Sequence, residues 1–176
     1  MQTQAESTIK EHVKKYPSIT RYGKRGTDFL EVGDRIVIYE KIDGANASFT
    51  REGDELVAYS RNIRLDECIT LRGFYHFVKS LPVEEFEEGL IYYGEWNVPH
   101  TINYPEETRD QFYLFDIFDM TMGTDFGGFI DHQYVRIEAF QLGFNLAPIL
   151  YEGPYISDEH YGASSENQIL QQQEKA

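Results

Sequence analysis

The chain has 176 residues, a formal net charge of −14 and a single cysteine, Cys68. One cysteine excludes an internal disulfide and a cysteine-based zinc site, and the five scattered histidines show no metal-ligand spacing. The acidic balance opposes non-specific nucleic-acid binding, although residues 1–26 are locally basic and form either a basic patch or a solvated face. Because no apolar run is long enough to span a membrane and the polar start resembles no export signal, we expect a cytoplasmic protein without a membrane partner.

Length and composition favour one folded domain that is rich in strands. The 13 tyrosines and 12 phenylalanines suit strands and aromatic-lined surfaces and argue against a disordered chain. In chain order, the patterns predict a helix from Ser7 to about Tyr16, strands at 35–39, 47–51 and 56–61, a helix at 69–81, strands at 90–96 and 111–119, a helix from Asp131 to about Leu142, and a short strand at 146–151.

The segment Glu40–Asn46 places one lysine, Lys41, between a β-branched strand and an Asp-Gly pair. Asp43-Gly44 is a strong hairpin signal, so we predict that the first three strands form an antiparallel meander. A lysine at the end of a rigid strand acts as a nucleophile when its amine is neutral, which burial or a nearby cation favours. The alternative is an exposed edge lysine that discourages aggregation.

Three further features stand on the strands that follow this lysine. Arg61 ends one predicted strand, Glu95 stops an apolar run, and Phe115 lies inside the next strand. Each alone is usually structural, but with Lys41 and in this order they resemble the covalent nucleotidyltransferases, which include polynucleotide ligases and capping enzymes. The closest likeness is to ATP-dependent RNA ligases of the phage RNA ligase 2 type. The residues that carry it are Lys15–Ile19, Glu40–Asn46, Ser60-Arg61, Tyr93–Trp96 and Phe112–Phe118.

The resemblance implies a lysyl-AMP intermediate at Lys41, formed from ATP with release of pyrophosphate. AMP would then pass to the 5′-phosphate of RNA, and a 3′-hydroxyl would seal the strand, as in RNA repair. By motif position, the ATP-binding residues are Glu40, Ile42, Asn46, Arg61, Glu95 and Phe115, with Phe115 stacking on the adenine and Glu95 binding the ribose. The metal residues are Asp43 and Glu95, which would hold Mg²⁺ through water.

Two later motifs of these ligases are missing: a Glu-Gly followed by an apolar strand, and a Lys-x-Lys. Glu152-Gly153 is followed by Pro154, which cannot donate to a central ladder, so we interpret residues 152–155 as a loop. We therefore expect an α+β fold, an antiparallel-sheet nucleotidyltransferase (ligase adenylation) domain with flanking helices, truncated at the C-terminus. It would cover residues 1–162, and residues 163–176 would form a disordered tail.

Several alternatives stay open. The chain is a fragment, a natural short protein that has lost activity, or half of a split enzyme that another chain completes. A catalytically inactive nucleotide- or RNA-binding relative and a DNA ligase or capping-type enzyme are therefore alternatives to an active RNA ligase. An incomplete sheet favours self-association or a completing chain.

Overall fold

The computed structural model describes residues 15–20, 29–122 and 127–156. Their contacts group residues 15–16 and 42–147 into a main unit, and residues 17–20, 29–41 and 148–156 into a smaller unit. Residues 7–14 of the expected N-terminal helix and the tail expected from residue 163 lie outside the described residues. Within the described part of the chain, no helix is long and apolar enough to cross a membrane.

The smaller unit is an antiparallel pair of strands, β1 (Arg35–Tyr39) and β8 (Ile149–Pro154). Strand β1 was expected to form a hairpin with the strand after Lys41, and this prediction is wrong because β1 pairs with β8 instead. The loop expected over residues 152–155 is also wrong, since β8 runs to Pro154. Among the described residues β8 has no neighbouring strand on its other side, and a proline is tolerated at the end of such an edge strand, where no N–H is needed.

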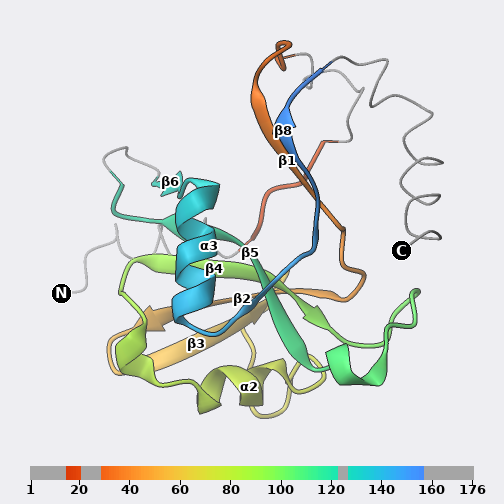
Figure 1. The fold of residues 1–176 in the computed structure, drawn as a ribbon. Coiled ribbons are helices and arrows are strands. Elements are labelled where there is room, and N and C mark those ends of the chain that lie inside the picture. The colour runs from red at the N-terminus through yellow and green to blue at the C-terminus, as the bar shows by residue number, and fades with distance from the viewer. Residues whose placement is uncertain (1–14, 21–28, 123–126, 157–176) are drawn as a thin grey trace. The chain divides into compact units, whose positions relative to one another are not determined.

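The main unit contains a sheet of six strands among the described residues, in the order β3-β2-β4-β5-β6, with β7 pairing to β5 (Figure 1). Its strands are β2 (Ala45–Glu52), β3 (Glu55–Ser60), β4 (Leu90–Asn97), β5 (Gln111–Asp119), β6 (Gly128–Phe129) and β7 (Asn145–Leu146). All pairs are antiparallel except the short parallel pair of β5 with β7. The strands predicted at 56–61, 90–96 and 111–119 are thus confirmed, and the strand predicted at 146–151 is divided between β7 and β8.

Helix α2 (Phe74–Ser80) packs against β3, and helix α3 (His132–Gln141) packs against β5. Short 3-10 helices lie at Val83–Glu85 and Glu106–Thr108. Helix α3 begins at the predicted cap, because Asp131 accepts a hydrogen bond from the backbone of Gln133 over 2.9 Å. Helix α2 begins later than predicted, since Leu71, Arg72 and Gly73 all have positive φ and cannot continue a right-handed helix.

One face of the main sheet packs with both helices into a single apolar core. Phe49 of β2 stacks on Tyr92 of β4 with ring centroids 5.0 Å apart, and Phe86 meets the Phe49 ring edge-on at 5.2 Å. The helices contribute the fully buried side chains Phe74, Val78, Val135 and Ala139. The fold is therefore α+β with antiparallel sheets and flanking helices, as the sequence predicted.

Candidate functional site

Glu40 and Lys41 follow strand β1 in the smaller unit. The backbone N–H of Glu40 donates to the carbonyl oxygen of Pro148 over 2.9 Å, and Lys41 is exposed to solvent. The main unit starts with the next residue, Ile42, which is buried with 8% of its surface exposed. The other expected site residues, Asp43, Asn46, Arg61, Glu95 and Phe115, also belong to the main unit.

The segment after the lysine lies directly against strand β4. The backbone N–H of Gly44 donates to Oε1 of Glu95 over 3.1 Å, and Asn46 stands opposite Glu95 in the register of β2 with β4. A Cβ at position 44 would lie 2.3 Å from the carbonyl oxygen of Trp96. Glycine is therefore required here by the close approach of two backbones, and not by the hairpin turn that the Asp-Gly pair predicted.

Arg61 directly follows strand β3 and is exposed. The last residue of β3, Ser60, pairs with Ala47 of β2, so Arg61 stands at the end of the sheet that also carries Asn46. The structure thus places Asn46 and Glu95 on the neighbouring strands β2 and β4, and Arg61 directly after β3, at the same end of the sheet.

A β-bulge in β5 turns Phe115 and Asp116 toward the same face of the sheet. Tyr93 pairs with Asp116 while Gly94 pairs with Leu114, which leaves Phe115 as the extra residue. Leu114 is fully buried in the core, so the two residues after it face away from the core. The bulge therefore places an aromatic ring and a carboxyl group next to each other on the second face.

Tyr16 lies on this second face and contacts both residues. Its ring meets the rings of Phe115 and Tyr93 edge-on, with centroids 4.9 and 5.2 Å away, and its hydroxyl donates a hydrogen bond to Oδ2 of Asp116. Burial raises the pKa of Asp116, against the opposite effect of the Tyr16 hydrogen bond. Burial, followed by the contact with Asp116, raises the pKa of Tyr16 well above its usual range.

Sequence reasoning did not assign Tyr16 or Asp116 to the site. The pair is 100 residues apart in the chain, and no local pattern connects the two residues. Both residues could have been found from their neighbours in the sequence, because Tyr16 lies in the Lys15–Ile19 motif and Asp116 directly follows Phe115.

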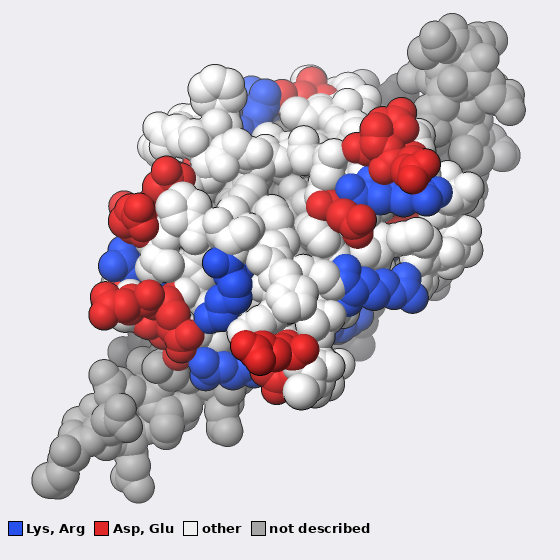
Figure 2. Space-filling model, turned by 90° about the horizontal axis from the view of Figure 1, so that it is seen from below, with Lys and Arg blue, Asp and Glu red and all other residues white. Residues whose placement is uncertain are grey.

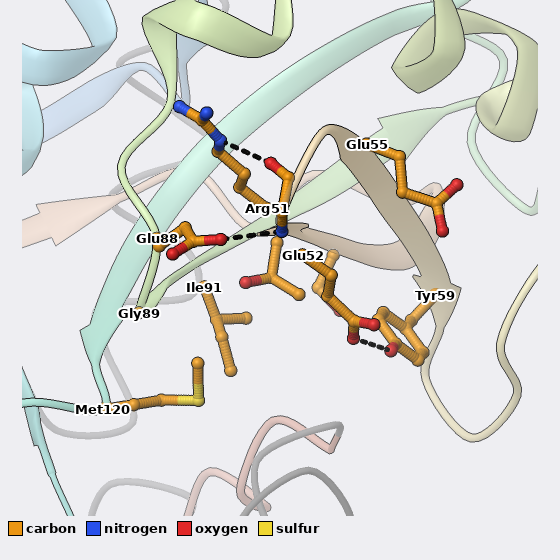
Figure 3. A pocket seen from close by; sticks show the side chains of 11 residues that line it. Arg51, Glu52, Glu55, Tyr59, Glu88, Gly89, Ile91 and Met120 are labelled. Carbon is orange, nitrogen blue, oxygen red and sulfur yellow. Dashed lines mark hydrogen bonds between the residues drawn. The ribbon is translucent and has the colours of Figure 1, made fainter. Parts of the chain in front are cut away.

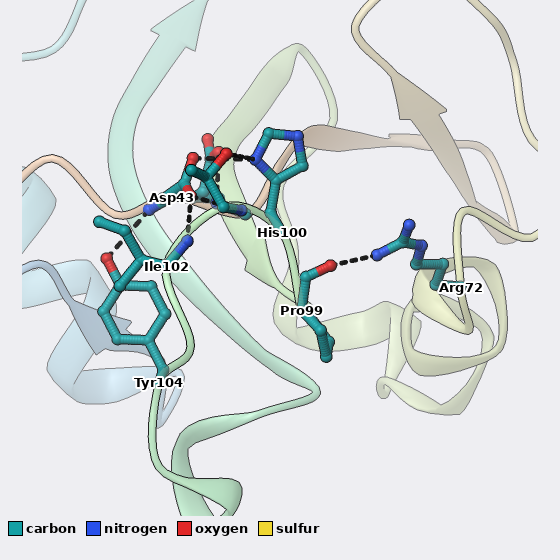
Figure 4. A network of polar contacts seen from close by, with 9 residues as sticks. Asp43, Arg72, Pro99, His100, Ile102 and Tyr104 are labelled. Atoms are coloured by element: carbon teal, nitrogen blue, oxygen red, sulfur yellow. Dashed lines mark hydrogen bonds and ion pairs between the residues drawn. The ribbon is translucent and has the colours of Figure 1, made fainter.

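The loop between β4 and β5 holds the carboxylate of Asp43 (Figure 4). Oδ2 accepts hydrogen bonds from the backbone N–H groups of Thr101 and Ile102 over 2.9 and 2.7 Å, and Oδ1 lies 3.0 Å from Nδ1 of His100. The Asp43 backbone N–H donates to the Tyr104 hydroxyl over 3.1 Å. The hydrogen bond from Ile102, with further contributions from His100 and Thr101, holds the pKa of Asp43 below its usual range.

These contacts bear on whether Asp43 and Glu95 suit the expected metal. Among residues 15–20, 29–122 and 127–156, no three or more His, Cys, Asp or Glu side chains group as metal ligands. Both carboxylate oxygens of Asp43 already face hydrogen-bonding groups of residues 100–102. Asp43 is therefore anchored to the loop by contacts to both of its oxygens, and its expected water-mediated contact with a metal, like that of Glu95, stays a prediction.

A separate hollow of about 420 Å³ opens beside the β2–β3 hairpin (Figure 3). In its wall, Glu88 accepts the Gly53 backbone N–H over 2.7 Å, and Glu52 accepts the Tyr59 hydroxyl over 3.2 Å. Burial and the nearby Glu52 charge raise the pKa of Tyr59 to about 12. None of the expected site residues lines this hollow, and its acidic groups stabilise the hairpin itself.

Charged side chains of both signs are interspersed on the face shown in Figure 2. Among the described residues, ion pairs join Lys79 and Arg64 to Glu55 over 2.9 and 3.5 Å. This face therefore carries no continuous basic patch of described residues that would bind a phosphate backbone by charge alone.

The α+β fold with antiparallel sheets is that of a nucleotidyltransferase-type domain. A family model described as RNA ligase matches residues 34–175. The chain therefore belongs to the RNA ligase family, which confirms the resemblance that was based on the Lys41 segment and the strands after it. No curated protein matches the chain significantly.

Solved ligases share this fold. An RNA ligase of Naegleria gruberi, in a mutant form with ATP and manganese, matches with a TM-score of 0.58 at 20% identity, over 73% of this chain and 40% of that one. A second mutant of the same ligase matches with a TM-score of 0.57 at 20% identity, over 80% of this chain and 45% of that one. A putative ATP-dependent DNA ligase from Aquifex aeolicus matches with a TM-score of 0.54 at 20% identity, over 90% of this chain and 43% of that one. The chain spans less than half the length of these proteins.

Proposed function

We propose that this chain supplies the adenylation chemistry of an ATP-dependent RNA ligase, with Lys41 as the nucleophile. The observation that carries the proposal is the RNA ligase family match over residues 34–175, which includes the whole ordered set from Lys41 to Phe115. The arrangement of Arg61, Asn46 and Glu95 at one end of the main sheet supports it.

In the proposed first step, the neutral amine of Lys41 attacks the α-phosphorus of ATP. A phosphorus–nitrogen bond forms, the bond to the bridging oxygen breaks, pyrophosphate leaves, and the amine loses a proton to solvent. AMP then passes to the 5′-phosphate of an RNA end, which releases Lys41, and a 3′-hydroxyl displaces AMP to seal the strand. Such transfers depend mainly on positioning and on neutralising phosphate charge.

The proposed binding roles follow the motif positions. Phe115 stacks on the adenine, which needs only an aromatic surface, and its place on the face opposite the core is consistent with this role. Glu40 and the backbone of Ile42 read the adenine edge, Glu95 binds the ribose, Arg61 binds ribose or phosphate, and Asn46 positions the reacting groups. A planar guanidinium matches phosphate oxygens well.

We assign Mg²⁺ as the metal of this proposal, held through water by Glu95. Magnesium prefers oxygen ligands and keeps several waters, so one carboxylate and the ATP phosphates suit it. When bound, it would supply positive charge that neutralises the phosphates.

The test is self-adenylylation. The chain is incubated with magnesium and ATP labelled at the α-phosphate, and a covalent AMP adduct is sought by intact mass and denaturing gel. We expect one AMP per chain, no adduct with Lys41→Arg, which keeps the charge, and an unchanged adduct with Lys79→Arg, which removes another lysine amine and keeps its charge beside Glu55. An adduct that persists in Lys41→Arg would overturn the assignment of the nucleophile.

A second candidate function is an inactive nucleotide- or RNA-binding relative, favoured by the exposure of Lys41 to solvent, since burial is one of the conditions that makes a lysine amine neutral. It predicts ATP binding without an adduct. A chain that forms the adduct only when a second protein is added would be part of a split enzyme. After adduct formation, sealing of nicked DNA in preference to RNA ends would replace the RNA assignment with a DNA ligase.

A further inference from the structure

The loop that joins β4 to β5, residues 98–110, is tied down at both of its ends. At its base the backbone N–H of Asp110 donates to the carbonyl oxygen of Asn97 over 2.8 Å. At its start the Arg72 guanidinium donates a hydrogen bond to the carbonyl oxygen of Pro99. A loop held in this way is a fixed support to which a neighbouring segment can be attached.

Asp43 attaches the lysine motif to this loop from two directions. Its side chain accepts the consecutive backbone N–H groups of Thr101 and Ile102, and its own N–H donates to Tyr104. Hydrogen bonds to an ionised carboxylate are stronger than those between neutral groups. The next residue, Gly44, donates its N–H to Glu95, so two consecutive residues after Ile42 are fixed through their backbones.

We propose that Asp43 is a positioning residue whose carboxylate clamps residues 100–102 to the lysine motif, and that it acts on adenylylation through this clamp and not as a metal ligand. The inference rests on the proposed function of Lys41, which stands two residues earlier in the chain. Both carboxylate oxygens contact the loop, and these contacts support the clamp. A small displacement of a reacting group can reduce a rate by about a hundredfold.

Two substitutions at the same position separate a clamp from a metal ligand. Asp43→Asn keeps an acceptor oxygen for Thr101 and Ile102, and its amide N–H can donate to Nδ1 of a neutral His100. It removes the negative charge that a metal site needs. Asp43→Ala removes every side-chain contact to the loop. Asp131→Ala is the matched control, because it also deletes a carboxylate that accepts a backbone N–H, at the start of α3.

The first measurement is the rate of adduct formation as a function of ATP and magnesium concentration. We expect Asp43→Ala to lower the maximal rate on the order of a hundredfold. Asp43→Asn should have a maximal rate within about threefold of that of the unmodified chain, with the same half-saturating magnesium concentration. Asp131→Ala should leave the maximal rate unchanged. If Asp43→Asn is as slow as Asp43→Ala, or needs more magnesium, the clamp is wrong and the carboxylate charge itself is used.

The second measurement is hydrogen exchange at the amides of Thr101 and Ile102, which requires no activity. The clamp predicts faster exchange in Asp43→Ala, near-normal exchange in Asp43→Asn, and no change at these amides in Asp131→Ala. Unchanged exchange in Asp43→Ala would overturn the clamp. An unmodified chain that forms no adduct but shows this exchange pattern would instead count against the function proposed for Lys41, so the two failures are distinguishable.

Discussion

The two faces of the main sheet are built from the same strands but differ in chemistry. On the core face, Phe49, Tyr92 and Phe112 are each 2% exposed or less and pack ring against ring. On the opposite face, the carboxylate of Glu95 accepts a hydrogen bond from the Gly44 backbone N–H, and the carboxyl group of Asp116 accepts one from the Tyr16 hydroxyl.

This difference follows from the alternation of side chains along a strand. One strand can therefore contribute to stability with every second residue and to the proposed site with the residues between them. Substitutions on the two faces should then change different measurements, which provides the predictions below.

The largest expected effect comes from the core face. Phe49→Ala should lower the free energy of unfolding by about 3–5 kcal/mol, because it removes a buried ring and leaves a cavity. Chemical denaturation measures this loss. Phe115→Ala, on the other face, serves as the comparison and should cost less than half as much. Equal losses would show that the two faces are not distinct in stability.

A smaller effect is expected for nucleotide binding at Phe115. Phe115→Ala should weaken ATP binding by about 1–3 kcal/mol, roughly 5- to 150-fold, because it removes the ring proposed to stack on adenine. Titration calorimetry measures the affinity. Phe115→Trp should retain binding, and Phe118→Ala, which removes a ring that contacts Phe129, should not affect it. Normal affinity in Phe115→Ala would exclude the stacking role.

The smallest effect concerns pH and Asp116. Burial raises the pKa of this carboxyl in the folded chain above its ordinary value of 3.8. Its contribution to stability is therefore complete below pH 3.8 and is lost as the pH rises through the raised folded value. Compared with Asp116→Asn, the unmodified chain should lose stability over that interval. Denaturation at a series of pH values tests this, and parallel curves for the two proteins would contradict it.

The sequence allowed good prediction of elements with strong local signals. Strands β4 and β5 have continuous β-branched and aromatic runs, and helix α3 has a capping aspartate and a terminal glycine, Gly143, with φ 69°. The Lys41 motif and its successors were found because a short segment carries each of them. Local pattern was sufficient in these cases.

Long-range pairing could not be predicted in the same way. Strand β1 pairs with β8, whose residues are more than a hundred positions later in the chain, while the Asp43-Gly44 pair offered a nearby hairpin. In the structure Asp43 binds the loop after β4, and Gly44 lies against the backbone of β4. Both contacts therefore depend on residues that are distant in the sequence. The Tyr16 contact with Asp116 depends on distant sequence in the same way.

The bulge at Phe115 shifts the alternation of core-facing and outward-facing side chains along strand β5 by one residue. Before it, Phe112 and Leu114 face the core; after it, Ile117 does, so the even-numbered series gives way to an odd-numbered one. Deleting Phe115 would remove the extra residue and restore a regular alternation, with Leu114 and Ile117 still facing the core. A one-residue deletion elsewhere in β5 would instead reverse the orientation of one part of the strand, so the bulge is the position where this strand can change its length by one residue.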